Sequence, residues 1–246
     1  MLPLRISIVT YNIWLTQRWD VRQPALGGFL KSFNPDLLCL QELQQTTRDF
    51  IDGALPSHRR VDDPYRGWTT ESNIYWRDAV FAHVEHGIEE VGIPDGDRRL
   101  FWVRLKIRGL DRTVLVATAH LTSQRNKVEC DTGQSPRVGQ IRHIIQALKR
   151  LNQAGEPLFF MGDMNDPVHP PRLLHEAGYP SCFAALGVQA PPTYHCYPTA
   201  DVPRAWITRE RLFDTGREGL SNAGHEIFVD AADKDKRDLI EYLKTL

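Results

Sequence analysis

The stretch LFFMGDMND, residues 158–166, is an apolar run that gives way abruptly to a polar cluster. The apolar run, taken from residue 157 to residue 161, predicts a buried strand. Gly162 then permits a sharp turn and the close approach of a ligand. Asp163 and Asn165 follow two residues apart, so both side chains can face one pocket. The alternative interpretation is an Asx-turn that closes the strand.

Three further apolar runs end in the same way, each with a polar residue at its C-terminal end. Asn12 follows ISIVTY, Glu42 follows DLLCLQ and His120 follows VLVATA. Four such endings predict one site assembled from distant segments. A set of two carboxylates, two carboxamides and a histidine suits a hard cation such as Mg²⁺, or Mn²⁺ in its place, held against a phosphate.

Each of these residues has an expected role in such a site. Glu42 is the expected metal ligand, because a strand holds it rigidly and Mg²⁺ often takes only one or two protein carboxylates. Asn12 is expected to fix the metal-bound Glu42 or the phosphate. His120 is expected to donate to a phosphate oxygen and stabilise transition-state charge. Asp163 is expected to orient or deprotonate water, and Asn165 to hold the nucleophile or a phosphate oxygen. An ordinary exposed glutamate, a turn asparagine and a structural histidine remain the alternatives.

Composition limits the class of protein. The chain has 246 residues and a formal net charge of −1, so no overall basic field indicates nucleic acid, although a local basic patch stays open. The N-terminal stretch MLPLRISIVTYN is not typical of a signal peptide, and no apolar run approaches the ~18 residues that span a bilayer. The cysteines form no CxxC pair, which favours reduced thiols in a cytoplasmic protein. They are Cys39, Cys130, Cys182 and Cys196. We also expect the protein to be a monomer.

The hydrophobic pattern predicts more strands than helices. Strands are expected at 5–13, 37–40, 157–161, at three places within 72–108, and from residue 113 to His120. Helices are expected at 21–33, 44–52, 136–151, 172–177 and 234–246, with loops at 56–67, 122–135 and 166–171 and weak strand signals in 178–209. Hairpins mix with single crossovers, so we expect an α/β (α+β) fold in which two packed mixed sheets lie between helices.

Taken together, TYN, LQE, AHLTS and GDMND resemble the endonuclease/exonuclease/phosphatase superfamily over roughly residues 5 to 206. The sequences of these motifs look closest to those of bacterial members, somewhat like the tyrosyl-DNA phosphodiesterase branch. The resemblance implies a four-layer α/β sandwich and magnesium-dependent hydrolysis of a phosphoester. It also implies that Glu42 and Asn12 arrange the metal, that His120 contacts the scissile phosphate, and that Asp163 and Asn165 act on the water nucleophile.

The C-terminal part departs from the pattern of the family. Ala205 stands where members usually carry an aspartate, and no Ser-Asp-His motif closes the chain. His225 is the nearest candidate for the missing catalytic histidine, with His195 as an alternative. Residues 1–209 are therefore expected to form the family domain and residues 210–246 an atypical tail. This tail is similar to the C-terminal segment of some c-type cytochromes, but the absence of CxxCH excludes covalent haem.

Two functions follow from these motifs. One is a Mg²⁺-dependent phosphodiesterase or nuclease acting on DNA or a small phosphodiester, impaired by about 10²–10⁴ in rate where an acid/base contact is lost. The other is a non-catalytic module that binds a phosphate-bearing ligand or a protein. Trp14, Trp19 and Trp68 are candidates for stacking on bases, with core packing as the alternative.

Overall fold

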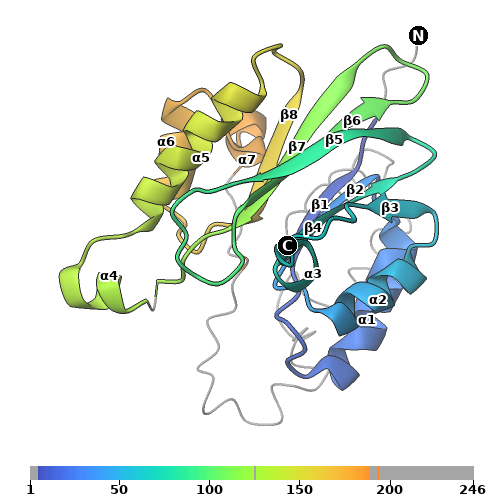
Figure 1. Cartoon of the computed structure of the whole chain (residues 1–246), viewed down its shortest axis with the longest axis horizontal. Helices are drawn as coiled ribbons and strands as arrows, with labels where there is room; N and C mark the ends of the chain where they lie inside the picture. Colours follow the sequence, from blue (N-terminus) through green and yellow to red (C-terminus); the bar gives the residue numbers. More distant parts are fainter. Residues whose placement is uncertain (1–4, 125, 189–192, 194–246) are drawn as a thin grey trace. The chain divides into compact units, whose positions relative to one another are not determined.

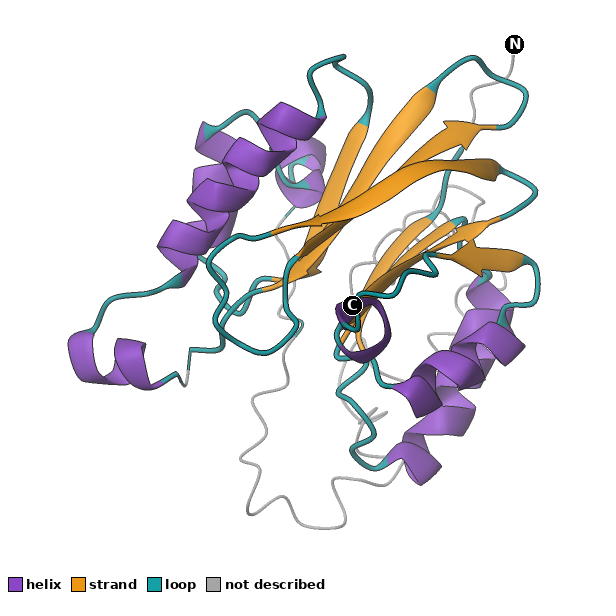
Figure 2. Ribbon diagram, viewed as in Figure 1, coloured by secondary structure: helices purple, strands orange, loops and turns teal. Residues whose placement is uncertain are grey.

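The strands form two four-stranded sheets that pack face to face. The computed structural model describes residues 5–124, 126–188 and 193. Figures 1 and 2 show α1 and α2 on the outer side of one sheet and α5 and α6 on the outer side of the other, with the two sheets between them. This arrangement confirms the predicted α/β sandwich of two mixed sheets flanked by helices.

The first sheet has the strand order β1-β2-β4-β3. Its strands are β1 (Ile8–Asn12), β2 (Leu37–Gln41), β3 (His58–Arg60) and β4 (Ser72–Arg77). Its helices are α1 (Trp19–Phe33), α2 (Gln45–Ala54) and α3 (Gly67–Thr70). Strands β1 and β2 are parallel because α1 carries the chain back between them, and the other pairs are antiparallel.

The second sheet has the strand order β5-β6-β7-β8. Its strands are β5 (Phe81–Glu89), β6 (Leu100–Ile107), β7 (Thr113–His120) and β8 (Leu158–Asp163). The helices of this half are α4 (Lys127–Thr132), α5 (Arg137–Leu151), α6 (His169–Glu176) and α7 (Cys182–Leu186). Strands β7 and β8 are parallel, with α5 in the connection between them.

Apolar side chains fill the spaces between the layers. The cluster between the two sheets includes Trp68, Phe81 and Phe101, all nearly fully buried. A second cluster lies under α5 and a third under α1 and α2. Cys39 lies in the inter-sheet cluster, and burial raises the pKa of its thiol. The described cysteines are free thiols, as expected, and Cys196 lies outside the described residues.

The structure corrects the expected elements at four places. The predicted loop 56–67 contains β3, which is too short for a hydrophobic pattern, and the predicted loop 122–135 contains α4, which buries no side chain. Helix α6 begins at His169 and not at residue 172, because prolines are tolerated in a first helical turn. Helix α7 lies in the segment 178–209, where the hydrophobic pattern indicated only weak strand signals. The helix predicted at 234–246 lies outside the described residues.

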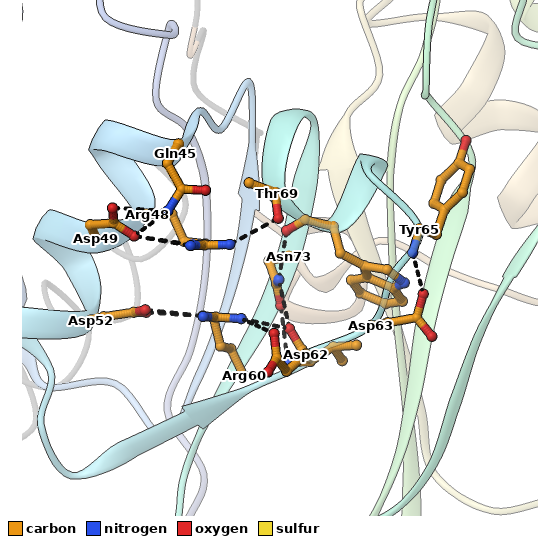
Figure 3. Close-up of polar contacts among 12 residues, drawn as sticks. Gln45, Arg48, Asp49, Asp52, Arg60, Asp62, Asp63, Tyr65, Thr69 and Asn73 are labelled. Carbon is orange, nitrogen blue, oxygen red and sulfur yellow. Dashed lines mark hydrogen bonds and ion pairs between the residues drawn. The ribbon is translucent and has the colours of Figure 1, made fainter.

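Polar contacts hold the segment around β3 in place (Figure 3). Arg60 Nε donates to both carboxylate oxygens of Asp52 on α2, each at 3.1 Å. The buried Asn73 of β4 accepts a hydrogen bond from the backbone N–H of Val61 at 3.1 Å and donates to the carbonyl oxygen of Trp68 at 2.7 Å. These non-local contacts order a charged stretch that by composition alone reads as a loop.

Candidate active site where the parallel strands end

The two parallel strand pairs bring four chain segments to one rim of the sandwich. In the first sheet Asn12 is paired with Gln41, the residue before Glu42. In the second sheet His120 is paired with Asp163. Because β8 also packs against β1 and β2, the carboxyl ends of both pairs meet. Topology therefore places four of the candidate residues at the same rim.

The side chains of these four residues converge. Asn12 Nδ2 donates to Glu42 Oε1 at 3.0 Å and to Asp163 Oδ2 at 2.8 Å. His120 Nε2 lies 3.8 Å from Glu42 Oε1 and 3.7 Å from Asp163 Oδ2. One carboxamide thus joins two carboxylates that come from different sheets, and one imidazole faces both of them.

Asn165 joins the cluster through the loop after β8. Its backbone N–H donates to Asp163 Oδ1 at 3.0 Å, which is the Asx-turn considered as the alternative for this motif. Its side-chain Nδ2 donates to the carbonyl oxygen of Leu121 at 2.8 Å. Asp163 can close the Asx-turn and contact Asn12 at the same time, because Oδ1 accepts from the Asn165 N–H and Oδ2 accepts from Asn12 Nδ2. The amide of Asn165 is directed at backbone, so it ties the two loops together.

Backbone conformation at this rim is unusual. Glu42 and Asn165 have φ angles of 54° and 49°, which non-glycine residues seldom adopt. Gly162 has a φ of 148°, and a Cβ atom at this position would lie 2.0 Å from the carbonyl oxygen of Ala119. Only glycine allows β8 to approach β7 here. Strained backbone collects at functional sites, where the surrounding structure holds it.

His120 is neutral at pH 7. It is only 3% exposed, and burial together with the charge of Arg98 lowers its pKa to about 4, against the opposing effect of Asp163 and Asp95. Nδ1 has no hydrogen-bond partner among the described residues. A proton on Nδ1 would therefore be buried without an acceptor. A proton on Nε2 would face the carboxylates of Glu42 and Asp163, so this tautomer is favoured.

The donor set fits a divalent cation with few protein ligands. Within the described residues, neither Glu42 nor Asp163 forms an ion pair with a lysine or arginine. Two adjacent negative charges without a paired cation are what Mg²⁺ or Mn²⁺ would neutralise. No group of three or more His, Cys, Asp or Glu residues able to hold a metal is found in the described part of the chain. A site with one or two carboxylates and several waters remains the type that fits.

Asn12 contacts both carboxylates through its amide nitrogen, and its expected part in arranging a metal stays a prediction. Its Oδ1 accepts a hydrogen bond from the backbone N–H of Trp14 at 2.8 Å. That donor fixes which end of the amide carries oxygen. The Nδ2 group therefore faces Glu42 and Asp163, and the amide oxygen faces the backbone of Trp14.

A small polar cavity lies beside His120. It has a volume of about 220 Å³ and is lined by Asp95, Arg98, Thr122, Ser123 and Asn126. Within it, Arg98 Nε pairs with Glu71 Oε2 at 3.2 Å. A larger cavity of about 510 Å³ lies at the start of β7, away from all the candidate residues that the structure describes.

Buried polar residues of α5 support the loop that follows His120. Arg137 Nη1 donates to the carbonyl oxygen of Thr122 at 2.9 Å, and Gln140 Oε1 accepts from the Thr122 N–H at 3.2 Å. Arg137 Nε also pairs with Asp166 Oδ2 at 3.4 Å. Sequence reasoning missed these residues. Their position on the same helical face as the apolar residues of α5 was the available signal.

The three tryptophans named as stacking candidates have different environments. Trp68 is 1% exposed and belongs to the inter-sheet core, so it cannot stack on a ligand. Trp19 is half-buried and makes an edge contact with Phe50. Trp14 is 45% exposed. It is the only one of the three that is exposed.

The C-terminal candidates lie outside the described residues. They are His195, Ala205 and His225, together with the cytochrome-like tail. In the part of the chain that the structure describes, no helix is both long enough and apolar enough to cross a membrane.

The two-sheet sandwich and its rim of converging polar residues define a fold that is shared with known proteins. The sequence profile of the Endonuclease/Exonuclease/phosphatase family matches residues 9–219, and the chain therefore belongs to this family. This membership confirms the resemblance that the motifs carried. A search of curated protein sequences gave no match.

Three solved structures illustrate the shared fold. TDP2 from D. rerio, complexed with a single-strand DNA product, is 21% identical, with a TM-score of 0.58 over 75% of this chain and 71% of that one. The human Nocturnin catalytic domain with a bound sulfate anion is 19% identical, with a TM-score of 0.63 over 78% and 80%. A family member from Bacteroides thetaiotaomicron is 18% identical, with a TM-score of 0.57 over 70% and 68%.

Proposed function

We propose that this protein hydrolyses a phosphodiester by metal-assisted attack of water, with Mg²⁺ or Mn²⁺ held by Glu42 and Asp163. The observation that carries the proposal is the shared hydrogen bonding of both carboxylates to Asn12 Nδ2, at 3.0 and 2.8 Å. Carboxylates from two different sheets are drawn together without a paired cationic side chain among the described residues. This arrangement would be costly unless a cation completes it.

A divalent cation bound there would polarise a phosphoryl oxygen and lower the pKa of a nearby water. Glu42 is held for this purpose by the end of a fully buried strand and by the hydrogen bond from Asn12. Its left-handed backbone conformation turns it out of the sheet plane toward the rim. The expected effect of these constraints is a carboxylate that needs no reorganisation when substrate binds.

Asp163 is suited to orient an attacking water. Its Oδ1 is fixed by the backbone N–H of Asn165, and its Oδ2 faces the shared site. A carboxylate fixed in this way could accept a hydrogen bond from a water bound to the same cation and so orient it. Asn165 contributes by holding this loop to the end of β7 through Leu121. In this proposal Asn165 acts by positioning Asp163.

His120 is suited to donate a hydrogen bond to a nonbridging phosphate oxygen. Its imidazole is neutral, and its Nε2 faces the same space as Glu42 and Asp163. Burial keeps water away from the donor, which strengthens its interaction with developing negative charge. Arg98, on the wall of the adjacent polar cavity, adds fixed positive charge beside it.

The structural neighbours support a phosphate-bearing substrate. The human Nocturnin domain holds a sulfate, which is a tetrahedral oxyanion, and D. rerio TDP2 was solved with a DNA product. The net charge of −1 on this chain disfavours an extended contact with duplex DNA. A single strand or a small phosphodiester is the substrate that we propose, with residual catalysis by the described cluster.

A non-catalytic phosphate-binding module is the second candidate. It is favoured by Ala205, which replaces the aspartate expected from the family pattern, and by the absence of a Ser-Asp-His motif. Such a module would use the same rim to hold a phosphate without turnover.

Hydrolysis of bis-p-nitrophenyl phosphate with Mg²⁺ or Mn²⁺ distinguishes the two candidates. We expect Glu42→Gln to lower the metal-dependent rate by about 100-fold or more, because several kcal/mol of electrostatic stabilisation are lost. Glu90→Gln, which alters an exposed glutamate paired with Arg99, is the matched control. Equal rates for the wild type and Glu42→Gln would remove the enzyme and leave the binding module.

A further inference from the structure

Trp14 is an exposed indole tied directly to the catalytic cluster. The residue is 45% exposed, and its backbone N–H donates to Asn12 Oδ1 at 2.8 Å. The opposite end of the same amide holds Glu42 and Asp163. A single side chain therefore sets the distance between the tryptophan and the two carboxylates.

The backbone that carries this indole is strained. Trp14 and Leu15 have φ angles of 58° and 50°, so two bulky residues in succession adopt the left-handed conformation. Bulky residues avoid this region, and they remain there only when the surrounding structure holds them. Among the described residues with exposed large hydrophobic side chains, Trp14 alone has a positive φ.

Arg22 holds the strained turn. Its Nη1 donates to the carbonyl oxygen of Ile13 at 2.5 Å, and its Nη2 donates to those of Trp14 and Leu15 at 3.2 and 3.3 Å. The guanidinium Cζ also lies 5.5 Å from the centroid of the Trp14 ring. One side chain from α1 therefore fixes both the backbone and the ring.

The ordinary explanation for an exposed apolar side chain is that isolated ones are common on protein surfaces. That explanation covers Val84, which is 48% exposed at the register shift of the edge strand β5 and has no positive φ. It does not cover Trp14, because the chain adopts unfavourable dihedral angles at this residue and Arg22 contacts both its backbone and its ring. Strain maintained beside a reactive cluster indicates a function for the strained residue.

We propose that Trp14 is a specificity-determining residue that stacks on a nucleobase carried by the phosphodiester. This inference rests on the proposed function, because it places the base beside a phosphate that His120 and a cation at Glu42 and Asp163 would hold. A flat, open indole offers stacking to any base without reading its sequence. The preferred substrates are accordingly nucleoside phosphodiesters, and an alkyl phosphodiester such as a lipid headgroup gains nothing from Trp14.

Two substrates with the same leaving group test this inference. They are thymidine 5′-(p-nitrophenyl phosphate) and methyl p-nitrophenyl phosphate, which differ in the nucleoside that carries the stacking base. We expect Trp14→Ala to lower kcat/KM for the thymidine ester by about 5- to 150-fold, with a change of less than about twofold for the methyl ester. Trp14→Phe should retain most of the preference, and Val84→Ala should leave both substrates unaffected. An unchanged ratio of the two kcat/KM values in Trp14→Ala would overturn the inference.

A binding measurement separates this inference from the proposed catalytic function. Calorimetric titration of each ester into Glu42→Gln and into Glu42→Gln with Trp14→Gly requires no turnover, and glycine accepts the φ of this position. We expect the Trp14 change to weaken binding of the thymidine ester alone. Wild-type protein that hydrolyses neither ester would defeat the proposed function, while selective loss of thymidine-ester binding would still support stacking. Equal affinities with and without the indole would defeat the stacking role whatever the activity.

Discussion

Replacing Arg137 by methionine removes a charge that is buried almost completely. The guanidinium is 1% exposed and contacts Asp166 at 3.4 Å, Glu129 at 2.5 Å and the carbonyl oxygen of Thr122 at 2.9 Å. Methionine fills much of the same volume but donates no hydrogen bond. The carboxylate of Asp166, which is 6% exposed, would lose its arginine partner, and the backbone oxygen would lose this donor.

The expected loss of stability is about 3–5 kcal/mol, the usual cost of removing one partner from a buried ion pair. Glu129 adds little to this figure, because it is 21% exposed and can regain water. Total stabilities of domains are about 5–15 kcal/mol, so the variant should remain folded but be clearly weakened. Because the same side chain holds the loop after His120, we expect kcat to fall as well.

Urea unfolding followed by tryptophan fluorescence measures this effect. Arg150→Met is the matched control, since Arg150 lies on the same helix and pairs with Glu89 while 58% exposed. An exposed pair contributes about 0–1 kcal/mol. A difference of less than about 1 kcal/mol between the Arg137 and Arg150 variants would refute the reasoning that the buried network supports the fold.

Two further predictions concern other parts of the sandwich. Gly162→Ala should destabilise the protein by at least about 1–3 kcal/mol and abolish hydrolysis, because its Cβ would lie 2.0 Å from a backbone carbonyl oxygen of β7. Gly139→Ala is the control, because a Cβ at this position in α5 meets nothing within 4 Å. The control should raise the melting temperature, since alanine favours a helix over glycine. A melting temperature for Gly162→Ala at or above that of the wild type would contradict the close approach of the strands. Cys39 should resist alkylation in the native protein, because burial raises the pKa of its thiol. The exposed Cys130 of α4 and Cys182 of α7 should react. Equal labelling of the three cysteines, measured by mass spectrometry, would count against the buried position of Cys39.

The sequence predicted the convergence of four candidate side chains, because local pattern and topology agree there. Asn12, Glu42, His120 and Asp163 each end an apolar run, and the carboxyl ends of parallel strands meet at one edge. Local pattern therefore located the residues before their contacts were known. It did not show that Asn12 bridges both carboxylates, since that depends on how the two sheets are placed against each other.

Other features were missed because they depend on non-local contacts. Strand β3 is polar and only three residues long, so it has no hydrophobic periodicity that could predict it. It is a strand because it pairs with β4. Helix α4 buries no side chain and relies on Asn126, whose side chain accepts from the N–H of Glu129. Arg98 and Gln140 carried no motif, and their positions beside the loop after His120 follow from the packing of β6 and α5.

Binding of Mn²⁺ to the purified protein tests most directly whether Glu42 and Asp163 form one cation site. Calorimetric titration should give a single site in the wild type, and Glu42→Gln and Asp163→Asn should each weaken it by about tenfold or more. Glu90→Gln should leave the affinity unchanged. An affinity that is the same in all four proteins would contradict the shared site, as would a loss in Glu42→Gln without a matching loss in Asp163→Asn.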